Sequence, residues 1–478
     1  MTYFENHNFL NSKFEQPHNH LDPGNGTTNG PDPNKIWMED SITSAIRVIC
    51  VLILRIGFIL AQVGSIPVEN AFMIIFRNII EMATAIFVYG FIGFQLSFGK
   101  KSFYGMINYE GYIGDENANL SLATLGFSSC LLGTAITSTM LVARLRQLPM
   151  LLITVLISSA FLPILMCWCW SSQGWMTHVK LVDQRVSVKD FGANLVVHVP
   201  TATIGLIGTL FLGRRIMKLK DVDKFSLGNE YTSGIVTGYI FIIIGHIGLN
   251  MPTSSYEARH EMRDYISHVS VNSLMALGAG ILVISLLVVV FTRDVYRYWI
   301  IVKCLQGGLA GVVIVSAGID VYTPAINFGI ACGGSMIFFL VSNLVHYSAV
   351  EDCCNIVAIY LVCGSLGVLL PSVLGSKEHL GLSVPFYQSL IHLLWQFLCL
   401  IIVLITTIAI FLSVFTLLHV IGVLRNEYEE ENHQRAKVLY GRLPWKRYLD
   451  RIFMINDKSK DISPESNRDA MNQTFTAT

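Results

Sequence analysis

The sequence predicts an all-α integral membrane protein with eleven transmembrane helices. Of its 478 residues, 53% are hydrophobic and only 14% are charged, and the mean hydropathy is +0.54. Soluble domains carry charge on about a quarter of their residues, so this composition excludes an ordinary soluble domain. The apolar residues form runs long enough to cross a hydrocarbon layer about 30 Å thick. The net charge of zero gives no reason to expect nucleic acid as a partner.

The two ends of the chain differ from this apolar body. Residues 1–42 are rich in Asn, Pro, Gly and His, contain no apolar run and no signal peptide, and are expected to form a disordered arm. The arm contains Asn25-Gly26-Thr27, a glycosylation acceptor that works only on the extracellular side. Asn472 in the other tail matches the same pattern, so at most one of the two is used. We therefore expect a transmembrane domain at 43–425 and a tail at 426–478.

The transmembrane domain divides into eleven apolar segments joined mostly by short loops, which favours a single bundle. An odd number of crossings places the termini on opposite sides of the membrane. The segments have their centres near Leu52, Thr84, Thr134, Leu156, Ile204, Tyr239, Gly280, Ala310, Gly333, Leu366 and Ile408.

Basic residues in the short loops predict the orientation. One set of loops holds Arg144 and Arg146, a basic cluster at 214–224, and Arg293 with Arg297. The opposite set dilutes its basic residues with acids, as at 256–264. Together with the basic tail after Arg425, this pattern predicts a cytoplasmic C-terminus and an extracellular N-terminus, which places Asn25 correctly for a glycan.

The fifth segment, Asp190–Arg215, carries an ionisable residue in its middle. At about 1.5 Å per residue, His198 lies roughly 12 Å past Asp190, which is close to the midplane of the bilayer. An ionisable group at that depth is costly and indicates a permeation route. The alternative is a packing histidine bonded to a neighbouring carbonyl.

The tenth segment repeats the pattern of the fifth. In both segments an acid opens the helix and a polar ring follows eight positions later, and the topology makes the two helices enter from opposite faces. Inverted five-helix halves of this kind are a recurring transporter architecture, with the route at their interface.

The acid that opens the fifth helix does not lie on the same face as the ring. Eight residues exceed two helical turns by about 80°, so Asp190 does not share a face with His198 and is better placed as an N-cap. A capping carboxylate could still favour cations in a vestibule. The repeated sets are Asp190, Asn194 and His198, and Asp352, Asn355 and Tyr360.

Several motifs, in order and spacing over residues 45–425, resemble the ammonium transporter, methylammonium permease and Rhesus protein superfamily. The resemblance implies a homotrimer in the plasma membrane of a eukaryotic cell. Each protomer is expected to hold its own pore between two inverted five-helix halves, with an eleventh helix bracing the outside. The motifs are GFILAQVGSIPVENA (57–71), YGFIGFQLSFG (89–99), MLVARLRQ (140–147), DFGANLVVH (190–198), FLGRR (211–215), GHIGLN (245–250) and EDCCNIVAIYLVCGSLG (351–367).

Several functional residues of the family do not match this chain. The first of its paired pore histidines matches His198, but the second matches Tyr360. The aromatic gate of the sixth helix falls on Leu249, next to the matching Asn250. The outer tryptophan matches Trp168 or Trp170, and the gate of the third helix is best met by Phe127, which the alignment could move by two positions. The Gly-Leu-Asp element of the family's tail is absent.

The chemistry implied by the resemblance is the movement of ammonium or methylammonium. Aromatic faces replace part of the water around the cation through cation–π attraction of up to about 2 kcal/mol. Ammonia then crosses an apolar lumen while a histidine pair passes the proton. Tyr360 is expected to hydrogen-bond His198 through its hydroxyl. A phenol is already protonated and neutral at pH 7, so the two-histidine relay is not expected in its usual form.

Two other functions remain open from the sequence. One is a non-conducting relative that senses ammonium or regulates another membrane protein, which Leu249, Tyr360 and the altered tail favour. The other is a channel for a neutral gas, ammonia or carbon dioxide. The sequence contains no nucleophile–base set and no metal-spaced cluster, so neither an enzyme, a cofactor nor a metal site is expected. The ten cysteines lie in or beside apolar segments and are expected to be reduced thiols.

Overall fold

The computed structural model describes most of the transmembrane domain. The predicted glycan site Asn25, the basic cluster 214–224 and the tail after Arg425 lie outside the described residues. Helix α2 begins at Pro33, so 33–42 is helical rather than part of an unstructured arm. Proline is tolerated in a first helical turn, because the N–H that it lacks would have no partner there. The described residues are 33–65, 71–116, 118–142, 144–181, 184–213, 229–252, 262–291, 297–348, 350–376 and 385–425.

Each of the eleven predicted segments is helical in the structure. Within the described ranges, nine helices are long and apolar enough to cross a membrane, and Ser233–Leu249 and Ile300–Ser316 are shorter apolar helices. The first-half elements are α2 (Pro33–Gly64), α3 (Ala71–Val88), η2 (Tyr89–Gly93), α4 (Phe94–Phe98), α5 (Leu120–Leu141), α6 (Gln147–Leu156), η3 (Ile157–Phe161), α7 (Leu162–Trp170), η4 (Asn194–His198) and α8 (Val199–Leu212). The remaining helices are α10 (Asn229–Leu249), α11 (Met262–Phe291), α12 (Arg297–Ser316), α13 (Pro324–Tyr347), η6 (Val357–Cys363), α14 (Gly364–Leu374) and α15 (Pro385–Ile421).

Four of the predicted segments contain a short π-helical stretch, labelled η. In two of them a proline follows closely, Pro163 after η3 and Pro200 after η4. Proline donates no backbone hydrogen bond and its ring crowds the preceding turn, so the helix widens locally instead of breaking. Two of the π turns, η4 and η6, contain the polar rings His198 and Tyr360.

The fifth helix begins with a side-chain cap, as the sequence predicts. The two carboxylate oxygens of Asp190 accept hydrogen bonds from the backbone N–H groups of Leu195 and Val196, both at 3.0 Å. Ala193 adopts a left-handed conformation with φ of 67° so that the chain can turn into the helix. The carboxylate therefore satisfies two N–H groups that have no partner within the helix.

The tenth helix begins in the same way. The oxygens of Asp352 accept from the N–H groups of Ile356 and Val357 at 2.9 and 2.7 Å, and Asn355 is left-handed with φ of 55°. The repeated cap, turn and π helix identify η4–α8 and η6–α14 as equivalent elements of two five-helix halves.

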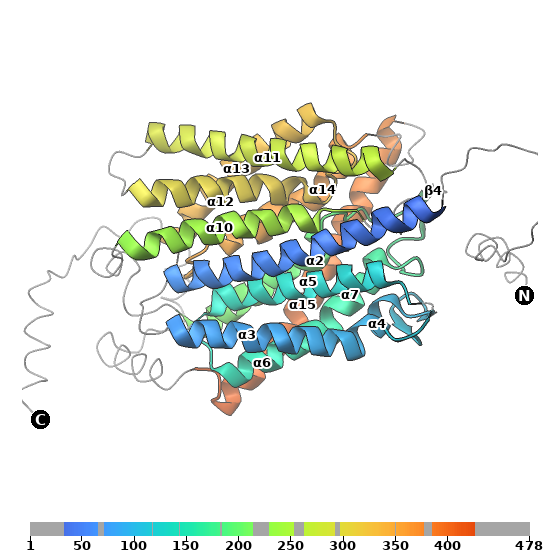
Figure 1. The fold of residues 1–478 in the computed structure, drawn as a ribbon, viewed down its shortest axis with the longest axis horizontal. Helices are drawn as coiled ribbons and strands as arrows, with labels where there is room; N and C mark the ends of the chain where they lie inside the picture. Colours follow the sequence, from blue (N-terminus) through green and yellow to red (C-terminus); the bar gives the residue numbers. More distant parts are fainter. Residues whose placement is uncertain are drawn as a thin grey trace, which may run out of the picture. The chain divides into compact units, whose positions relative to one another are not determined.

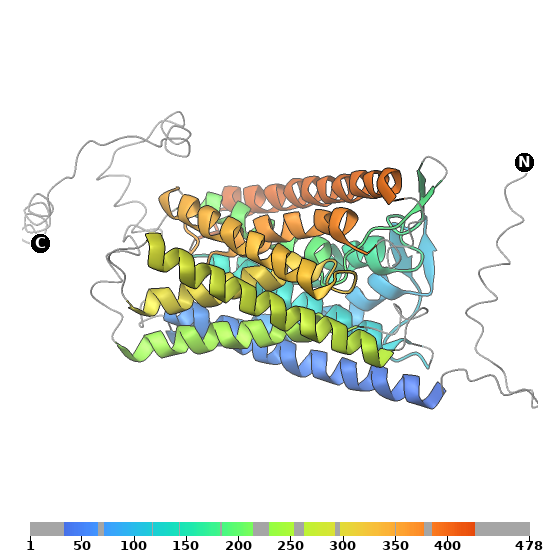
Figure 2. The same cartoon turned by 90° about the horizontal axis from the view of Figure 1, so that it is seen from above.

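The equivalent elements meet at the centre of the bundle, where α8 packs on α5 and on η6, and α12 packs on η6 and α14. The most apolar stretch of Asn194–Leu212 is 83% buried, against 22% for Ala71–Phe98, so the fifth helix is central and the second is peripheral. Helix α15 packs on both α8 and α14 and therefore braces the two halves. Figure 1 shows α10, α2, α5 and α3 running side by side, and Figure 2 shows α15, in orange-red, along one edge.

Two antiparallel hairpins cap one end of the bundle. The hairpin of β1 (Lys101–Phe103) and β2 (Ile107–Tyr109) joins α4 to α5, and that of β3 (Val179–Leu181) and β4 (Gln184–Val186) joins α7 to η4. The turn of the first hairpin holds Trp168, described below.

Candidate pore site

His198 is the last residue of η4 and is fully buried. Its Nδ1 lies 2.6 Å from Oδ1 of Asn194, one turn earlier. The amide nitrogen of Asn194 donates to the carbonyl of Val313 in the other half at 2.9 Å, which orients the amide. Gly367 permits this contact, because a Cβ there would lie 2.5 Å from that amide nitrogen. The cross-half bond fixes the imidazole in position.

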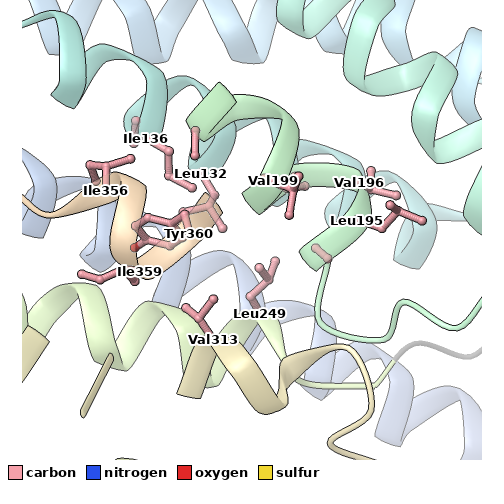
Figure 3. Close-up of a cluster of buried hydrophobic side chains, with 14 of the residues drawn as sticks. Leu132, Ile136, Leu195, Val196, Val199, Leu249, Val313, Ile356, Ile359 and Tyr360 are labelled. Atoms are coloured by element: carbon pink, nitrogen blue, oxygen red, sulfur yellow. The ribbon is translucent and has the colours of Figure 1, made fainter. Parts of the chain in front are cut away.

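Tyr360 lies beside His198, but the predicted hydrogen bond between them is wrong. The ring centroids are 5.4 Å apart and tilted by 48°, yet neither the Tyr360 hydroxyl nor Nε2 of His198 has a hydrogen-bond partner in the described part of the chain. Figure 3 shows the phenol oxygen at the end of the ring away from Val199 and Leu249. The two residues therefore contact each other through their rings, and the hydroxyl extends beyond the contact.

A third polar ring, which the sequence analysis did not single out, completes the cluster. His246 of α10 is buried, and its ring lies 5.4 Å from that of His198 in a stacked geometry and 5.5 Å from that of Tyr360. The available signal was the one that identified His198, an ionisable residue within an apolar helix. His246 lies inside the GHIGLN motif (245–250), in which the family resemblance assigns a role to Leu249 and Asn250 but not to His246.

Apolar side chains from both halves lie around the Tyr360 ring (Figure 3). Leu249 is 2% exposed and takes part in this wall, where the family resemblance implies an aromatic gate. The wall offers no hydrogen bonds, so the polar ring atoms are the groups that a small solute can engage there. The other labelled members of the cluster are Leu132, Ile136, Leu195, Val196, Val199, Val313, Ile356 and Ile359.

A narrow pocket adjoins Tyr360 near the start of the tenth helix, and it leaves no room for a water molecule. Phe58, Tyr239, Ile242 and Cys354 are among the residues that line it. The hydroxyl of Tyr239 donates to the carbonyl of Cys354 at 3.3 Å and accepts from the amide of Gln306 at 2.7 Å. The polar end of this pocket is therefore internally satisfied, unlike the ring cluster.

The two candidate tryptophans have different positions. Nε1 of Trp168 donates to the carbonyl of Met106 in the first hairpin at 2.8 Å, which anchors that ring to the end of the bundle. Nε1 of Trp170 donates to the carbonyl of Asp190 at 3.0 Å. Trp170 thus contacts the segment that leads into η4 and His198, and it is the better placed of the two to line an entrance.

Phe127 and Asn250 also lie near this end of the central helices. The Phe127 ring packs edge-on against Tyr89 at 4.9 Å. The amide of Asn250 packs closely on Gly192, where a Cβ would lie 2.4 Å from its Oδ1, in the loop that precedes η4. Asn250 therefore supports the loop of the Asp190 cap.

Burial changes the pKa of the two aspartates that cap η4 and η6. Asp190 is 3% exposed, and burial raises the pKa of its carboxyl to about 6, with the backbone N–H bonds opposing the shift. Asp352 has the same environment, and its pKa is also raised to about 6 by burial. Both caps are consequently ionised at neutral pH, but they titrate in the mildly acidic range.

Some buried charges of the bundle have a structural role. Glu81 in α3 pairs with Arg55 at 3.3 Å and with Arg77 at 3.0 Å, so one carboxylate is shared by two guanidinium groups. Among the described residues, no three His, Cys, Asp or Glu side chains are placed to hold a metal ion. None of the ten cysteines forms a disulfide.

Known proteins resemble this chain over most of its length. The model of the Ammonium Transporter Family matches residues 42–442. "Putative ammonium transporter sll0537" of Synechocystis is 23% identical and covers 68% of this chain, which spans 60% of that protein. "Putative ammonium transporter 1" of Caenorhabditis elegans is 21% identical, and the match covers 80% of this chain and 74% of that protein.

Solved structures share the fold at low identity. A "Sensor Amt Protein" superposes with a TM-score of 0.72 at 19% identity and covers 84% of this chain and 98% of its own. Saccharomyces cerevisiae Mep2 gives 0.66 at 18% identity, with coverage of 83% and 91%. The similarity in structure establishes the fold, and the family match across most of the sequence establishes the relationship: this chain belongs to the Ammonium Transporter Family.

Proposed function

We propose that this chain transports ammonium, as the cation or as ammonia, through a route between its two five-helix halves. Family membership and the buried polar rings at the centre of the bundle support the proposal. The proposed route passes Trp170 and Leu249, reaches His198 and then passes Tyr360. Trp168, Phe127 and Asn250 support its entrance, and the ionised Asp190 cap favours cations there.

The observation that carries the proposal is the hydrogen bonding of the two ring nitrogens of His198. Its Nδ1 bonds an amide oxygen, which makes Nδ1 the donor and leaves a lone pair on Nε2. That nitrogen is buried and has no partner in the described residues. A buried acceptor left unsatisfied costs about 1–3 kcal/mol, and a solute with N–H groups offsets that cost. Packing alone does not explain why such a group lies deep in the bundle.

This chemistry favours ammonium or ammonia over carbon dioxide, which has no hydrogen to donate. A neutral ammonia channel remains a related form of the same proposal, and it is distinguished by the absence of charge movement. The second candidate is a non-conducting ammonium sensor. It is favoured by Tyr360 and Leu249, which stand where the family has a histidine and an aromatic gate.

We further propose that the protein is a plasma-membrane homotrimer with its amino end outside and glycosylated at Asn25, and its carboxyl end inside. Gly329 and Gly333 on α13 support assembly, because a Cβ at either would meet nothing within 4 Å and the backbone is open to close approach. Gly307 and Gly308 on α12 pack instead on α11 within the same chain.

Uptake of labelled methylammonium tests the proposal in cells that lack their own ammonium permeases. We expect this chain to restore concentration-dependent uptake, which ammonium inhibits and potassium does not. If the chain reaches the membrane and binds ammonium but restores no uptake, the sensor is the correct function.

A further inference from the structure

Two histidines from different halves form a buried stacked pair. The rings of His198 on η4 and His246 on α10 lie 5.4 Å apart with an interplanar angle of 29°, and the side chains are 0% and 1% exposed. Each ring also lies within 5.5 Å of Tyr360. The pair therefore occupies the position in the bundle where the family resemblance implies two pore histidines, but one of the two comes from a different helix.

Hydrogen bonds assign the same tautomer to both rings. The amide of Asn194 uses its nitrogen to bond Val313, so its oxygen faces His198 and the Nδ1 of His198 must donate. The Nδ1 of His246 lies 2.8 Å from the carbonyl oxygen of Ile242, which can only accept, so this Nδ1 must donate as well. In the neutral state, each Nε2 is left with a lone pair and no hydrogen.

Both Nε2 atoms are buried and without partners in the portion of the chain that the structure describes. Neither ring can satisfy the other, because two acceptors do not form a hydrogen bond. The Tyr360 hydroxyl has a hydrogen to donate but extends away from Val199, which follows His198 in the chain (Figure 3). The cluster thus presents two acceptors close together, and what it lacks is a donor.

We propose that His246 supplies the second hydrogen-bond acceptor of the pore, so that Nε2 of His198 and Nε2 of His246 jointly bind one small N–H donor such as ammonium, methylammonium or ammonia. This inference rests on the proposed transport function and assigns the binding role to His246 instead of Tyr360. The imidazole that is absent from the tenth helix, where Tyr360 stands, is provided by the sixth. Potassium and carbon dioxide offer no hydrogen to either nitrogen and are discriminated against.

The pair of variants His246→Phe and His246→Gln tests the role. Phenylalanine keeps an aromatic ring in the stack but removes the acceptor, and we expect methylammonium uptake to fall by about tenfold or more, since one hydrogen bond to a charged group is worth about 1.5–3 kcal/mol. Glutamine retains an acceptor oxygen and should retain more uptake than phenylalanine. His419→Phe, at an exposed position on α15, is the matched control and should behave as wild type.

A rescue variant separates binding from packing. Adding Tyr360→His to His246→Phe returns a second imidazole to the cluster from the tenth helix, and uptake should recover at least in part. If His246→Phe is folded and transports within twofold of wild type, His246 is a packing residue and the inference is wrong. The inference is also wrong if glutamine and phenylalanine are equally impaired and the rescue fails.

A binding measurement separates this inference from the transport proposal. In protein labelled with ¹⁵N-histidine, ammonium chloride should shift the Nε2 resonances of both His198 and His246, assigned by comparison with single variants, whereas potassium chloride should not. Such shifts without wild-type uptake would support the site and refute transport. Uptake by wild type with no shift at His246 would refute the site and leave transport standing.

Discussion

The hydroxyl groups of two buried tyrosines show how neighbouring helices decide a residue's role. Tyr360 has no hydrogen-bond partner for its hydroxyl in the described residues, whereas Tyr239 both donates and accepts. We therefore expect Tyr360→Phe to leave the free energy of unfolding unchanged or raise it by about 1 kcal/mol, because it removes a buried unsatisfied group.

Tyr239→Phe is the matched control. It leaves the Gln306 amide without an acceptor and should lower the free energy of unfolding by about 1–3 kcal/mol. Denaturant unfolding of both variants in detergent measures the difference. A Tyr360→Phe variant as destabilised as Tyr239→Phe would mean that the Tyr360 hydroxyl makes a bond after all, as the sequence analysis expected.

The two capping aspartates predict an acidic pH dependence of stability. Burial raises the pKa of Asp190 and of Asp352 from 3.8 to about 6, so between these values the folded state binds protons more tightly than the unfolded state. The free energy of unfolding should therefore decrease as pH rises from about 4 to about 6, by on the order of 3 kcal/mol for each carboxyl, and then level off.

Asp190→Asn and Asp352→Asn should each remove about half of that pH dependence, and the double variant most of it. Unfolding midpoints measured between pH 4 and pH 8 test this expectation. An unchanged pH profile in the double variant would show that other groups cause it.

At the level of single residues, the sequence predicts positions better than contacts. The depth of His198 and the capping role of Asp190 follow from spacing along one helix, and the structure confirms the cap. The predicted bond between His198 and Tyr360 fails because side-chain direction depends on packing between helices. His246 was missed for a related reason, since its importance arises only where α10 meets η4.

At the level of elements, a close crossing between a helix of the first half and a helix of the second half depends on glycine. Gly238 of α10 faces α2, and a Cβ there would lie 2.8 Å from the carbonyl oxygen of Gly57 and 2.9 Å from the nitrogen of Ala61. Gly238→Ala should force the helices apart and lower the free energy of unfolding by about 1–3 kcal/mol.

Gly234 provides the control on the same helix, one turn away. A Cβ at Gly234 would meet nothing within 4 Å, so Gly234→Ala should be neutral or slightly stabilising through reduced backbone entropy in the unfolded chain. Thermal unfolding of the two variants compares them. Equal stability would show that α2 and α10 are not held in close contact.

The eleven helices follow from apolar run length, and all eleven predicted centres lie in helices. The π turns and the two hairpins were not predicted. A π turn depends on packing between helices, and a proline follows closely in only two of the four cases. Three-residue strands carry too few residues for an alternating pattern to be recognised.

At the level of the whole molecule, the repeated pattern of acid and ring predicted two equivalent halves, and the repeated caps and left-handed turns confirm that equivalence in detail. The role of α15 could come only from resemblance to a family, because its sequence is uniformly apolar. Its contacts with α8 and α14 provide the physical reason, since one long helix covers the equivalent helices of both halves.

The central claim is that the buried rings belong to a route for ammonium, and flux through purified protein in liposomes tests it most directly. We expect an ammonium gradient to drive solute flux through wild-type protein well above that of protein-free liposomes, with a potassium gradient of equal size driving none. His198→Ala should abolish the flux or its selectivity while the protein remains folded. Folded wild-type protein that gives no ammonium flux, or a His198→Ala variant with the flux and selectivity of wild type, would contradict the account.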